Sequence, residues 1–472
     1  MLAVALASRA IAIFAFPGLA HPDENFSFFE PAHRLAFGYG IKDLAFEDGL
    51  RSYVIPYLLA ALFRIAEPIF GGPQGYIRLA RLAIALISLA PVAAIYAMGR
   101  RTSLIHGLIA GLVAATWFDI VYFSYRPLTE AIGCDAALVA LALAARPRDE
   151  IGPKLGAAIG ACLALTAMVR LQLIPGVAFV AFWLGRGEAR RWLTMAAGGL
   201  PIALAFGAVD WITWGAPFRS YLQAVNFNLI EGKASNYGPR PADWYLVAIF
   251  ANWSLFIPAI AVLIAVRWRK SALWLGFAVV TVLVHSLIPH KNYRYIYPAM
   301  AALIVVAAMG SADLLAARAR ISKLAVAVTM ALWITASFVL AFYPPMAGRW
   351  AWSRGLILSE AALAKEPGLC GLLFYDQPWY ETGGYAFLHR DVPVYVSAFH
   401  PEAGRDGTPA FNAVVVRRSS LSAFPTYRRL ACYGEGGVDD ACTMMRAGPC
   451  RRVSGLTPLM QQHRLGERPY QD

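Results

Sequence analysis

Long apolar runs dominate residues 1–343 of this 472-residue chain, and they decide what it can fold into. A helix needs about 20 apolar residues to cross a bilayer, because each residue advances it by roughly 1.5 Å. The chain is 58% hydrophobic and only 15% charged, which is too apolar for a soluble domain of this length. We predict eleven crossings, at residues 1–20, 76–98, 102–122, 126–145, 152–169, 171–186, 192–211, 245–266, 271–289, 293–310 and 322–343.

The charge pattern orients these crossings. Lys and Arg gather at one set of helix ends, and the positive-inside rule places those ends in the cytoplasm. These basic ends are residues 100–101, 146–154, 186–191, 267–270 and 318–323. The net charge of +13 is therefore mainly topogenic and does not predict nucleic-acid binding. We expect the first helix to be retained, because no basic flank and no small-residue cleavage site mark a signal peptide.

This topology places a long loop, about residues 21–75, on the non-cytoplasmic face. The loop opens with His21-Pro22-Asp23-Glu24. Adjacent carboxylates at a membrane boundary perturb each other, so one stays basic while the other is paired or hydrogen-bonded. Asp23 is then a candidate general base for an acceptor hydroxyl, assisted by Glu24. The alternative is an ordinary solvated loop start.

A basic cluster, His290-Lys291-Asn292-Tyr293-Arg294, lies at another outer turn. Cationic side chains at headgroup depth form a natural phosphate site. We assign donor phosphate binding to His290, Lys291 and Arg294. The alternative is snorkelling of these side chains to lipid headgroups.

Two further outer patches are candidates for contacts with sugar. Residues 210–245 are rich in amides, aromatics and glycines, among them Asn226, Asn228 and Tyr237, a composition suited to carbohydrate but also to an interfacial segment. Arg126 and Glu130 stand at i and i+4, so we expect them to pair on one helix face.

Residues 344–472 differ in composition from the rest, so we divide the chain into a membrane domain, 1–343, and an extracytoplasmic α/β domain, 344–472. Strands are predicted at 371–375, 392–396 and 413–416, with a helix at 379–388. This domain carries four cysteines, which predict two disulfides with the pairing open and a zinc site as the alternative. Cys134 and Cys162 lie in predicted membrane helices and are expected to be inert.

In their order along residues 20–300, these motifs resemble the dolichyl-phosphate-mannose-dependent mannosyltransferases of the GT-C superfamily. The closest group makes the α-1,2 and α-1,6 linkages of N-glycans and GPI anchors. The resemblance rests on the tetrapeptide at 21–24 followed by Glu30 and His33, on Leu50-Arg51-Ser52-Tyr53-Val54-Ile55-Pro56, and on residues 290–298. Asn292 stands where the family has Glu, and Thr129 where it often has Asn.

The resemblance implies a GT-C fold and an inverting transfer of mannose from a polyprenyl phosphate to a hydroxyl of a lipid-linked glycan or glycolipid. It implies contacts to acceptor or sugar from a further set of residues. These are His21, Glu30, His33, Arg51, Tyr53, Arg126, Glu130, Asn226, Asn228 and Tyr237. We expect a monomer in a bacterial inner membrane, surrounded by membrane lipids, with its active site on the periplasmic face. No cofactor is expected to be required, although a divalent metal is an alternative.

Three other functions are compatible with the sequence. A transporter or flippase of lipid-linked sugars is the first, although transporters place their charges near the bilayer midplane. A metal-dependent oligosaccharyltransferase or ligase is the second. A non-catalytic subunit that binds lipid-linked sugar is the third.

Overall fold

The computed structural model describes residues 1–317, 322–344, 346–434 and 440–459. The chain divides into two compact units. We call residues 1–12 and 82–347 the helical unit, and residues 13–81 and 348–469 the loop–sheet unit. The predicted basic connection at 318–323 and the end of the predicted outer domain fall largely outside the described residues.

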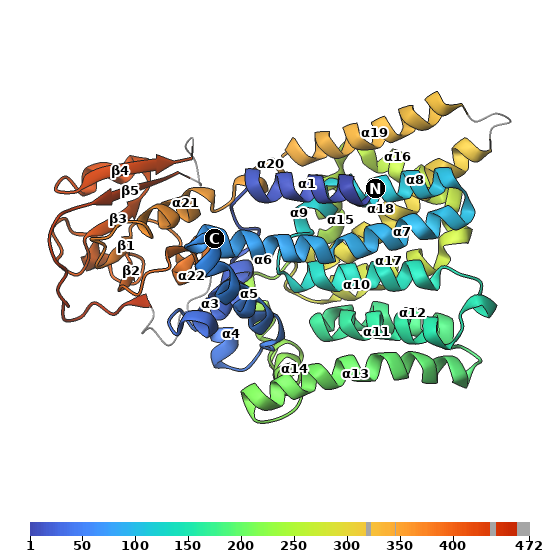
Figure 1. The fold of residues 1–472 in the computed structure, drawn as a ribbon, viewed down its shortest axis with the longest axis horizontal. Coiled ribbons are helices and arrows are strands. Elements are labelled where there is room, and N and C mark those ends of the chain that lie inside the picture. Colours follow the sequence, from blue (N-terminus) through green and yellow to red (C-terminus); the bar gives the residue numbers. More distant parts are fainter. Residues whose placement is uncertain (318–321, 345, 435–439, 460–472) are drawn as a thin grey trace. The chain divides into compact units, whose positions relative to one another are not determined.

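The helical unit is a bundle whose long helices run side by side (Figure 1). Its helices are α1 (Leu2–Ala15, whose last turn belongs to the other unit), α7 (Leu89–Thr102), α8 (Leu104–Thr116), α9 (Phe118–Phe123), α10 (Thr129–Ala144), α11 (Pro153–Val169), α12 (Ile174–Gly185), α13 (Ala189–Trp214), α14 (Arg219–Val225), α15 (Trp244–Trp253), α16 (Ile257–Arg267), α17 (Ala272–Leu287), α18 (Tyr293–Ala316) and α19 (Lys323–Phe342). The helix α6 (Pro73–Ile87) crosses from one unit to the other.

Five helical stretches among the described residues are long and apolar enough to span a membrane. They are Pro73–Thr102, Ala189–Trp214, Trp244–Leu287, Tyr293–Ala316 and Lys323–Phe342. Shorter apolar helices accompany them, at Leu2–Ala15, Leu104–Thr116, Pro153–Val169 and Leu171–Gly185. The protein is therefore an integral membrane protein.

Small residues let the helices of the bundle pack closely. A Cβ at Gly160 of α11 would overlap the Met195 carbonyl of α13. Helix α18 is the central helix, since 78% of its apolar window is buried. Contacts between small residues are how membrane helices approach one another, because lipid supplies no hydrophobic force between them.

The predicted first outer loop is largely helical rather than irregular. It contains α2 (Pro22–Glu24), the π-helix η1 (Asn25–Phe29), α3 (Glu30–Phe37), α4 (Leu44–Glu47) and α5 (Val54–Phe70). Gly38 ends α3 with φ of +88°, a conformation that favours glycine. Pro56, Leu59 and Phe63 lie on the buried face of α5. All of these elements belong to the loop–sheet unit.

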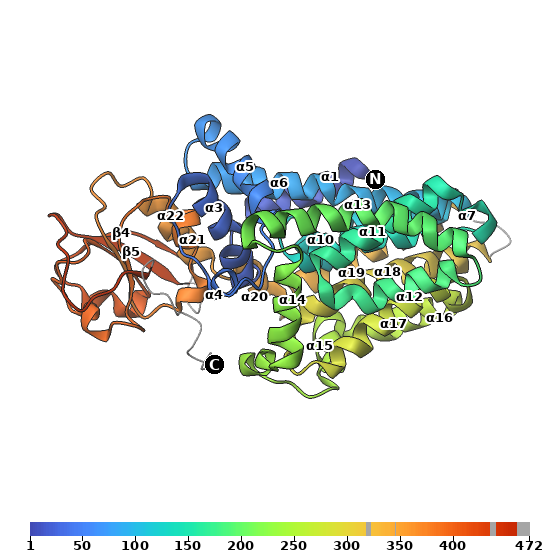
Figure 2. The same ribbon diagram turned by 90° about the horizontal axis from the view of Figure 1, so that it is seen from below.

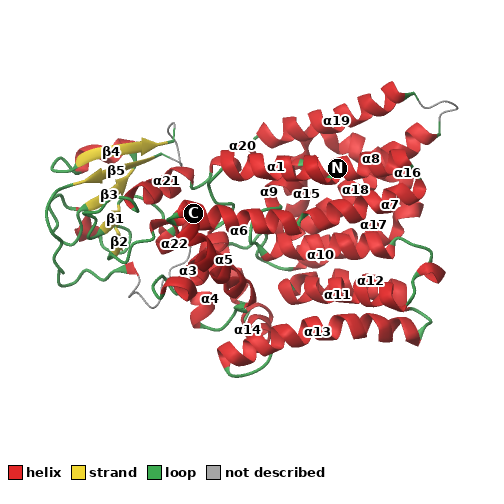
Figure 3. Ribbon diagram, in the orientation of Figure 1, coloured by secondary structure: helices red, strands yellow, loops and turns green. Residues whose placement is uncertain are grey.

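The C-terminal part of the loop–sheet unit holds a five-stranded sheet in the order β2-β1-β3-β5-β4 (Figure 3). Its strands are β1 (Leu372–Phe374), β2 (Val394–Val396), β3 (Ala413–Val416), β4 (Arg428–Tyr433) and β5 (Ala441–Met445). The first three pair in parallel, in the register Leu372↔Val394 and Leu372↔Ala413, and β5 runs antiparallel to β3 and β4. The three predicted strands are confirmed, whereas β4 and β5 were not predicted. The predicted helix at 379–388 is a 3-10 turn, η8 (Trp379–Glu381), followed by α22 (Gly384–Leu388).

Alternate residues of the strands face two hydrophobic cores, as the period of two in a strand requires. Leu372 and Phe374 pack with α21 (Arg354–Leu363) and α22, which lie together in Figure 2, whereas Leu373 faces Phe411 and Phe424 on the other side of the sheet. The short helix α20 (Met346–Ala351) precedes α21. The first face also receives Phe26, so the first outer loop shares the core of the sheet.

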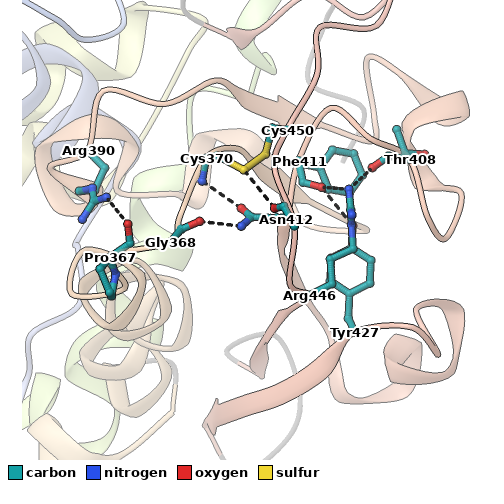
Figure 4. The surroundings of a disulfide bond; sticks show 11 residues. Pro367, Gly368, Cys370, Arg390, Thr408, Phe411, Asn412, Tyr427, Arg446 and Cys450 are labelled. Carbon is teal, nitrogen blue, oxygen red and sulfur yellow. Dashed lines mark hydrogen bonds between the residues drawn. A yellow bond between two sulfur atoms is a disulfide. The ribbon is translucent and has the colours of Figure 1, made fainter.

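Two disulfides, Cys370–Cys450 and Cys432–Cys442, cross-link this domain, which confirms the predicted bonds and removes the zinc alternative at these cysteines. Figure 4 shows the surroundings of the first disulfide. Asn412 accepts from the Cys370 amide at 3.0 Å and donates to the Gly368 carbonyl at 2.7 Å. The Arg446 guanidinium donates to the Phe411 carbonyl at 3.0 Å, so side chains of Asn412 and Arg446 hold the backbone near the disulfide.

Candidate functional site

Asp23 is held at the start of the first outer loop by two neighbours. The His21 ring caps α2 by accepting from the Asp23 amide at 3.2 Å. Arg51, 28 residues later in the same loop, binds the Asp23 carboxylate at 3.2 Å, and the Asp23 side chain is 24% exposed. A neighbouring guanidinium favours the charged form of a carboxyl group. The geometry therefore presents an accessible carboxylate that Arg51 holds in a fixed place.

Glu24 has different surroundings, although it is the next residue. Its side chain is fully buried, and Arg81 binds its carboxylate at 2.7 Å. The Ala20 amide donates to its other oxygen at 2.8 Å. Arg81 also donates to the carbonyls of Pro17 and Gly18, so it fastens the chain that leads into the acidic pair. Glu24 thus positions its neighbour and has no route to solvent.

Glu30 and His33 point into the protein and contact the C-terminal part of the same unit. The amides of Ile41 and Ala386 donate to the two oxygens of Glu30 at 2.7 and 2.8 Å. Burial raises the pKa of this carboxyl group to about 7. His33 lies 3.0 Å from the His389 ring, and burial lowers the pKa of the His33 imidazole to about 3. Both residues attach the first loop to α22 and to His389 at its end.

A second carboxylate accompanies Glu30 at the same turn. Glu360 of α21 accepts from the Gly383 amide at 2.8 Å, and burial raises the pKa of its carboxyl group well above the usual value. Gly384 has φ of +56°, and a Cβ there would come within 2.7 Å of Glu30 Oε2. A glycine is therefore needed where two acids meet the start of α22.

Arg51 and Tyr53, both predicted to bind acceptor or sugar, lie on the segment that leads into α5. The Tyr53 ring is 4.6 Å from the Phe46 ring, between centroids. Because Arg51 also binds Asp23, this segment connects the carboxylate to an aromatic surface.

In the helical unit, a buried cluster surrounds Glu130. Arg170 and Arg294 bind the same oxygen of its carboxylate at 3.1 and 3.3 Å. Thr129 donates to the other oxygen at 3.1 Å. The Tyr295 ring stacks on both guanidiniums, at 4.8 Å from Arg170 and 5.1 Å from Arg294. Arg170 and Tyr295 were not among the predicted site residues.

The predicted i, i+4 geometry of Arg126 and Glu130 is wrong, because α10 begins only at Thr129 and Arg126 precedes the helix. The buried Arg126 guanidinium donates to the Tyr122 carbonyl and the Tyr125 hydroxyl, each at 3.0 Å. It also stacks on the rings of both tyrosines. Arg126 therefore joins the end of α9 to the turn before α10.

The basic turn at 290–294 holds its side chains at different depths. The Lys291 ammonium donates to the carbonyls of Arg240 and Ile288 at 3.0 and 2.6 Å, and desolvation lowers its pKa. His290 is half-buried, and its ring lies 6.2 Å from the Tyr237 ring. Asn292 caps α18 by accepting from the Arg294 amide, so the residue that departs from the family pattern starts the helix.

Asn226 and Asn228 lie in the π-helix η4 (Asn226–Ile230). Asn226 donates to Glu231 at 2.5 Å, and Asn228 donates to the Ala224 carbonyl at 2.8 Å. The backbone of Arg240 bonds the Pro289 carbonyl, which brings this outer loop beside the basic turn. The structure thus places Tyr237 and His290 together, while both asparagines make local bonds.

Asp119 of α9 is a buried acid that the sequence reasoning missed. Its carboxylate accepts from the Tyr293 hydroxyl at 2.6 Å and the Trp253 indole at 3.4 Å. An acid within a predicted crossing was the available signal, because such residues are costly in hydrocarbon and are usually functional. In the parts of the chain that the structure describes, no cluster of three or more His, Cys, Asp or Glu residues is arranged to hold a metal.

Comparison with known proteins identifies the family. A model of the Alg9-like mannosyltransferase family matches residues 1–389. The chain belongs to this family. It is therefore a glycosyltransferase, and it keeps the membrane-embedded architecture that the fold shows.

Relatives and solved structures agree with this assignment. The chain is 26% identical to GPI mannosyltransferase 3 of Yarrowia lipolytica over 81% of its own length and 74% of that protein. It is 26% identical to GPI alpha-1,2-mannosyltransferase 3 of Mus musculus over 59% of its length, but spans only about half (52%) of that relative. The crystal structure of ArnT from Cupriavidus metallidurans bound to undecaprenyl phosphate has the same GT-C fold, with a TM-score of 0.58, 13% identity and 94% and 96% of the two chains covered.

Proposed function

We propose that this protein transfers mannose, with inversion, from a polyprenyl-phosphate donor to a hydroxyl of a lipid-linked glycan or glycolipid. The observation that carries the proposal is the contrast within the acidic pair. Asp23 is accessible and bound by Arg51, whereas Glu24 is buried against Arg81. A positioned and accessible carboxylate is what a general base for an acceptor hydroxyl requires.

In the proposed reaction, Asp23 accepts the proton of the acceptor hydroxyl as its oxygen bonds to the anomeric carbon. The bond from that carbon to the phosphate oxygen breaks, and the phosphate leaves with the bonding electrons. Cations near the leaving oxygen stabilise the charge that develops there. We assign this stabilisation to His290, Lys291 and Arg294, with Arg170 added because it shares the carboxylate of Glu130 with Arg294.

The roles of several predicted residues are refined in this proposal. Glu24 is a positioning residue rather than a second catalytic acid, and Glu30 and His33 hold the loop in place. Arg51 and Tyr53 remain candidates for acceptor contacts, as does Tyr237 beside His290. The residues that bond their own loop, Asn226 and Asn228, would have to exchange those bonds for sugar hydroxyls.

We infer that the chain acts as a monomer with eleven crossings and with its acidic loop on the periplasmic side of a bacterial inner membrane. Two disulfides in the loop–sheet unit support that side, because such bonds persist in oxidising compartments. The similarity to GPI mannosyltransferases supports mannose as the sugar. It also supports a glycolipid acceptor.

The test uses purified wild type, Asp23→Asn and Glu24→Gln in lipid nanodiscs. Each receives radiolabelled polyprenyl-phosphate mannose and a glycolipid extract of the native membrane. We expect wild type to label a new glycolipid and Asp23→Asn to do so at least about a hundredfold more slowly, the typical contribution of a general base.

Glu24→Gln serves as the matched control, since it changes the neighbouring acid. We expect it to lower thermal stability more than the rate of transfer by the folded fraction. Full transfer by folded Asp23→Asn would remove Asp23 as the base. No transfer by wild type from any prenyl-linked sugar would contradict the function, and uptake of lipid-linked sugar into vesicles would then favour the transporter.

A further inference from the structure

The first outer loop contains a pocket that the reaction above does not use. It has a volume of about 190 Å³ and lies between α3, the segment that follows it, α4 and the start of α5. The residues that matter for its chemistry are Arg34, Leu35, Ile41, Lys42, Phe46 and Tyr53. All of them belong to the loop–sheet unit.

The lining of this pocket carries two cations and no carboxylate. Arg34 is exposed and uses one N–H on the Gly40 carbonyl, at 3.0 Å. Lys42 has no hydrogen-bond or ion-pair partner within the described ranges. An exposed surface charge usually gains little from pairing. Two cations that line one pocket can, however, bind an anion, because hydrogen bonds to charged groups are shorter and stronger.

The other walls are apolar and aromatic. Ile41 and Phe46 are buried to 2% and 1% exposure and form the floor. The Phe46 and Tyr53 rings lie 4.6 Å apart, and burial raises the pKa of the Tyr53 phenol, which keeps it a neutral donor. An aromatic face beside cations suits a sugar ring that carries a negative group. Pockets for drug-sized ligands measure roughly 300–1,000 Å³, so this smaller pocket fits one substituted sugar.

The pocket is connected to the proposed base through three consecutive residues. Arg51 binds Asp23, Tyr53 lines the pocket, and the hydroxyl of Ser52 between them is buried without a partner in the part of the chain described. A ligand group seated against Tyr53 would therefore lie two residues along the chain from Arg51, the residue that binds Asp23.

We propose that this pocket binds a phosphate-bearing sugar of the acceptor headgroup and so selects glycolipids that carry such a group. Arg34 and Lys42 bind the phosphate, and Tyr53 stacks on the sugar ring. The inference rests on the proposed function, since it names the acceptor class of the same site. Its binding step is nevertheless measurable without transfer.

The first experiment measures binding directly. Mannose 6-phosphate is titrated into wild type, Lys42→Gln, Arg34→Gln and Arg428→Gln in nanodiscs of zwitterionic lipid. Arg428 is an exposed arginine of β4 and makes the same loss of charge outside the pocket. We expect Lys42→Gln and Arg34→Gln each to weaken binding about tenfold, and Arg428→Gln to leave it unchanged.

Two ligand comparisons identify the source of the phosphate. Suppose that inorganic phosphate and anionic phosphatidylglycerol vesicles bind as well as mannose 6-phosphate, and that Lys42→Gln weakens the binding of all three. In that case the pocket binds lipid headgroups, and the sugar assignment is overturned. If mannose without phosphate binds equally well, the anionic assignment is overturned. Binding of mannose 6-phosphate that does not depend on Lys42 or Arg34 overturns the site.

The second experiment measures transfer to glycolipid acceptors before and after phosphatase treatment of their sugars. We expect Lys42→Gln to raise the KM for the phosphorylated acceptor about tenfold, with kcat and the donor KM unchanged and no effect on the treated acceptor. An equal loss on both acceptors would show damage to the loop instead. Absence of transfer by wild type would contradict the proposed function and leave the binding result to decide the pocket.

Discussion

Glu130, on the one hand, and Glu30 and Glu360, on the other, are buried carboxylates that the protein holds in opposite ways. In the helical unit, Glu130 is matched by the guanidiniums of Arg170 and Arg294. In the loop–sheet unit, Glu30 and Glu360 are bound by backbone amides. A carboxylate that is buried away from water is stable in its charged form only if a cation is paired with it. A buried carboxyl group that is bound by backbone amides can instead take up a proton and become neutral. The first arrangement keeps charge inside the protein, and the second removes it near neutral pH.

The sharpest test of this contrast is Glu130→Gln, for which we expect the largest effect. It leaves two buried guanidiniums without a carboxylate, and breaking a buried ion pair costs about 3–5 kcal/mol. Thermal unfolding in nanodiscs should show a large decrease in the midpoint temperature. A decrease as small as that of a surface variant would mean that solvent already screens the cluster.

Glu30, a buried acid of the loop–sheet unit, predicts that the stability of this unit depends on pH. The pKa of Glu30 is raised to about 7 from 4.5, so the folded state binds more protons than the unfolded state between these values. Stability of this unit is then highest below about pH 4.5–5 and is lost as the pH rises through 7, by about 3 kcal/mol at 1.36 kcal/mol per pH unit. Hydrogen exchange at the Ile41 and Ala386 amides, corrected for intrinsic rates, should show less protection at pH 8 than at pH 6.

A Glu30→Gln variant gives the control for that measurement, because an amide does not titrate. In the variant, protection of these amides should no longer depend on pH. The free energy of protection should stay within about 1–3 kcal/mol of the wild-type value, which is the cost of one buried polar group without a partner. The same slope with pH in this variant would assign the dependence to another group, with Glu360 the first to examine.

Glu360→Gln is the matched partner of the Glu130 substitution. Burial raises the pKa of Glu360 well above its usual range, which favours the neutral form, so the change removes less charge than Glu130→Gln does. We expect a loss of about 1 kcal/mol. A loss as large as that of Glu130→Gln would show that Glu360 is ionised and would erase the distinction between the two arrangements.

The smallest effect is expected at the exposed ion pair between Arg101 and Glu150 at the predicted cytoplasmic ends. Both side chains are at least about one-third exposed, so solvent screens their attraction. Arg101→Gln should change stability by less than about 1 kcal/mol, with added salt having little further influence on the variant. A larger loss would identify this pair as part of a wider charge network.

Local patterns in the sequence were sufficient for much of the fold. Apolar runs located the helices of the bundle, and strands at 371–375, 392–396 and 413–416 were found because each is a short apolar run between turns. The antiparallel strands β4 and β5 were missed; β4, at the sheet edge, begins with two exposed arginines and its other residues are only partly buried. A strand at a sheet edge carries no clear alternation.

The site was predicted less completely, because its partners lie far apart in sequence. The partners of Glu130 at positions 170 and 294, for example, could not be predicted from its neighbours in sequence. Likewise, no residue near Glu24 in the sequence indicated that Arg81 is its partner. Composition identified which residues are unusual, but a single sequence carries no information on which of them meet.

The bond from Ala386 to Glu30 joins residues 356 positions apart. A ribosome adds roughly 5–20 residues per second, so Glu30 leaves it at least about 20 seconds before its partner exists. During that interval the loop that carries Asp23 lacks the turn against which it folds. The order of synthesis therefore makes this loop one of the last parts of the protein to reach its final form, after the helices that follow it have entered the membrane.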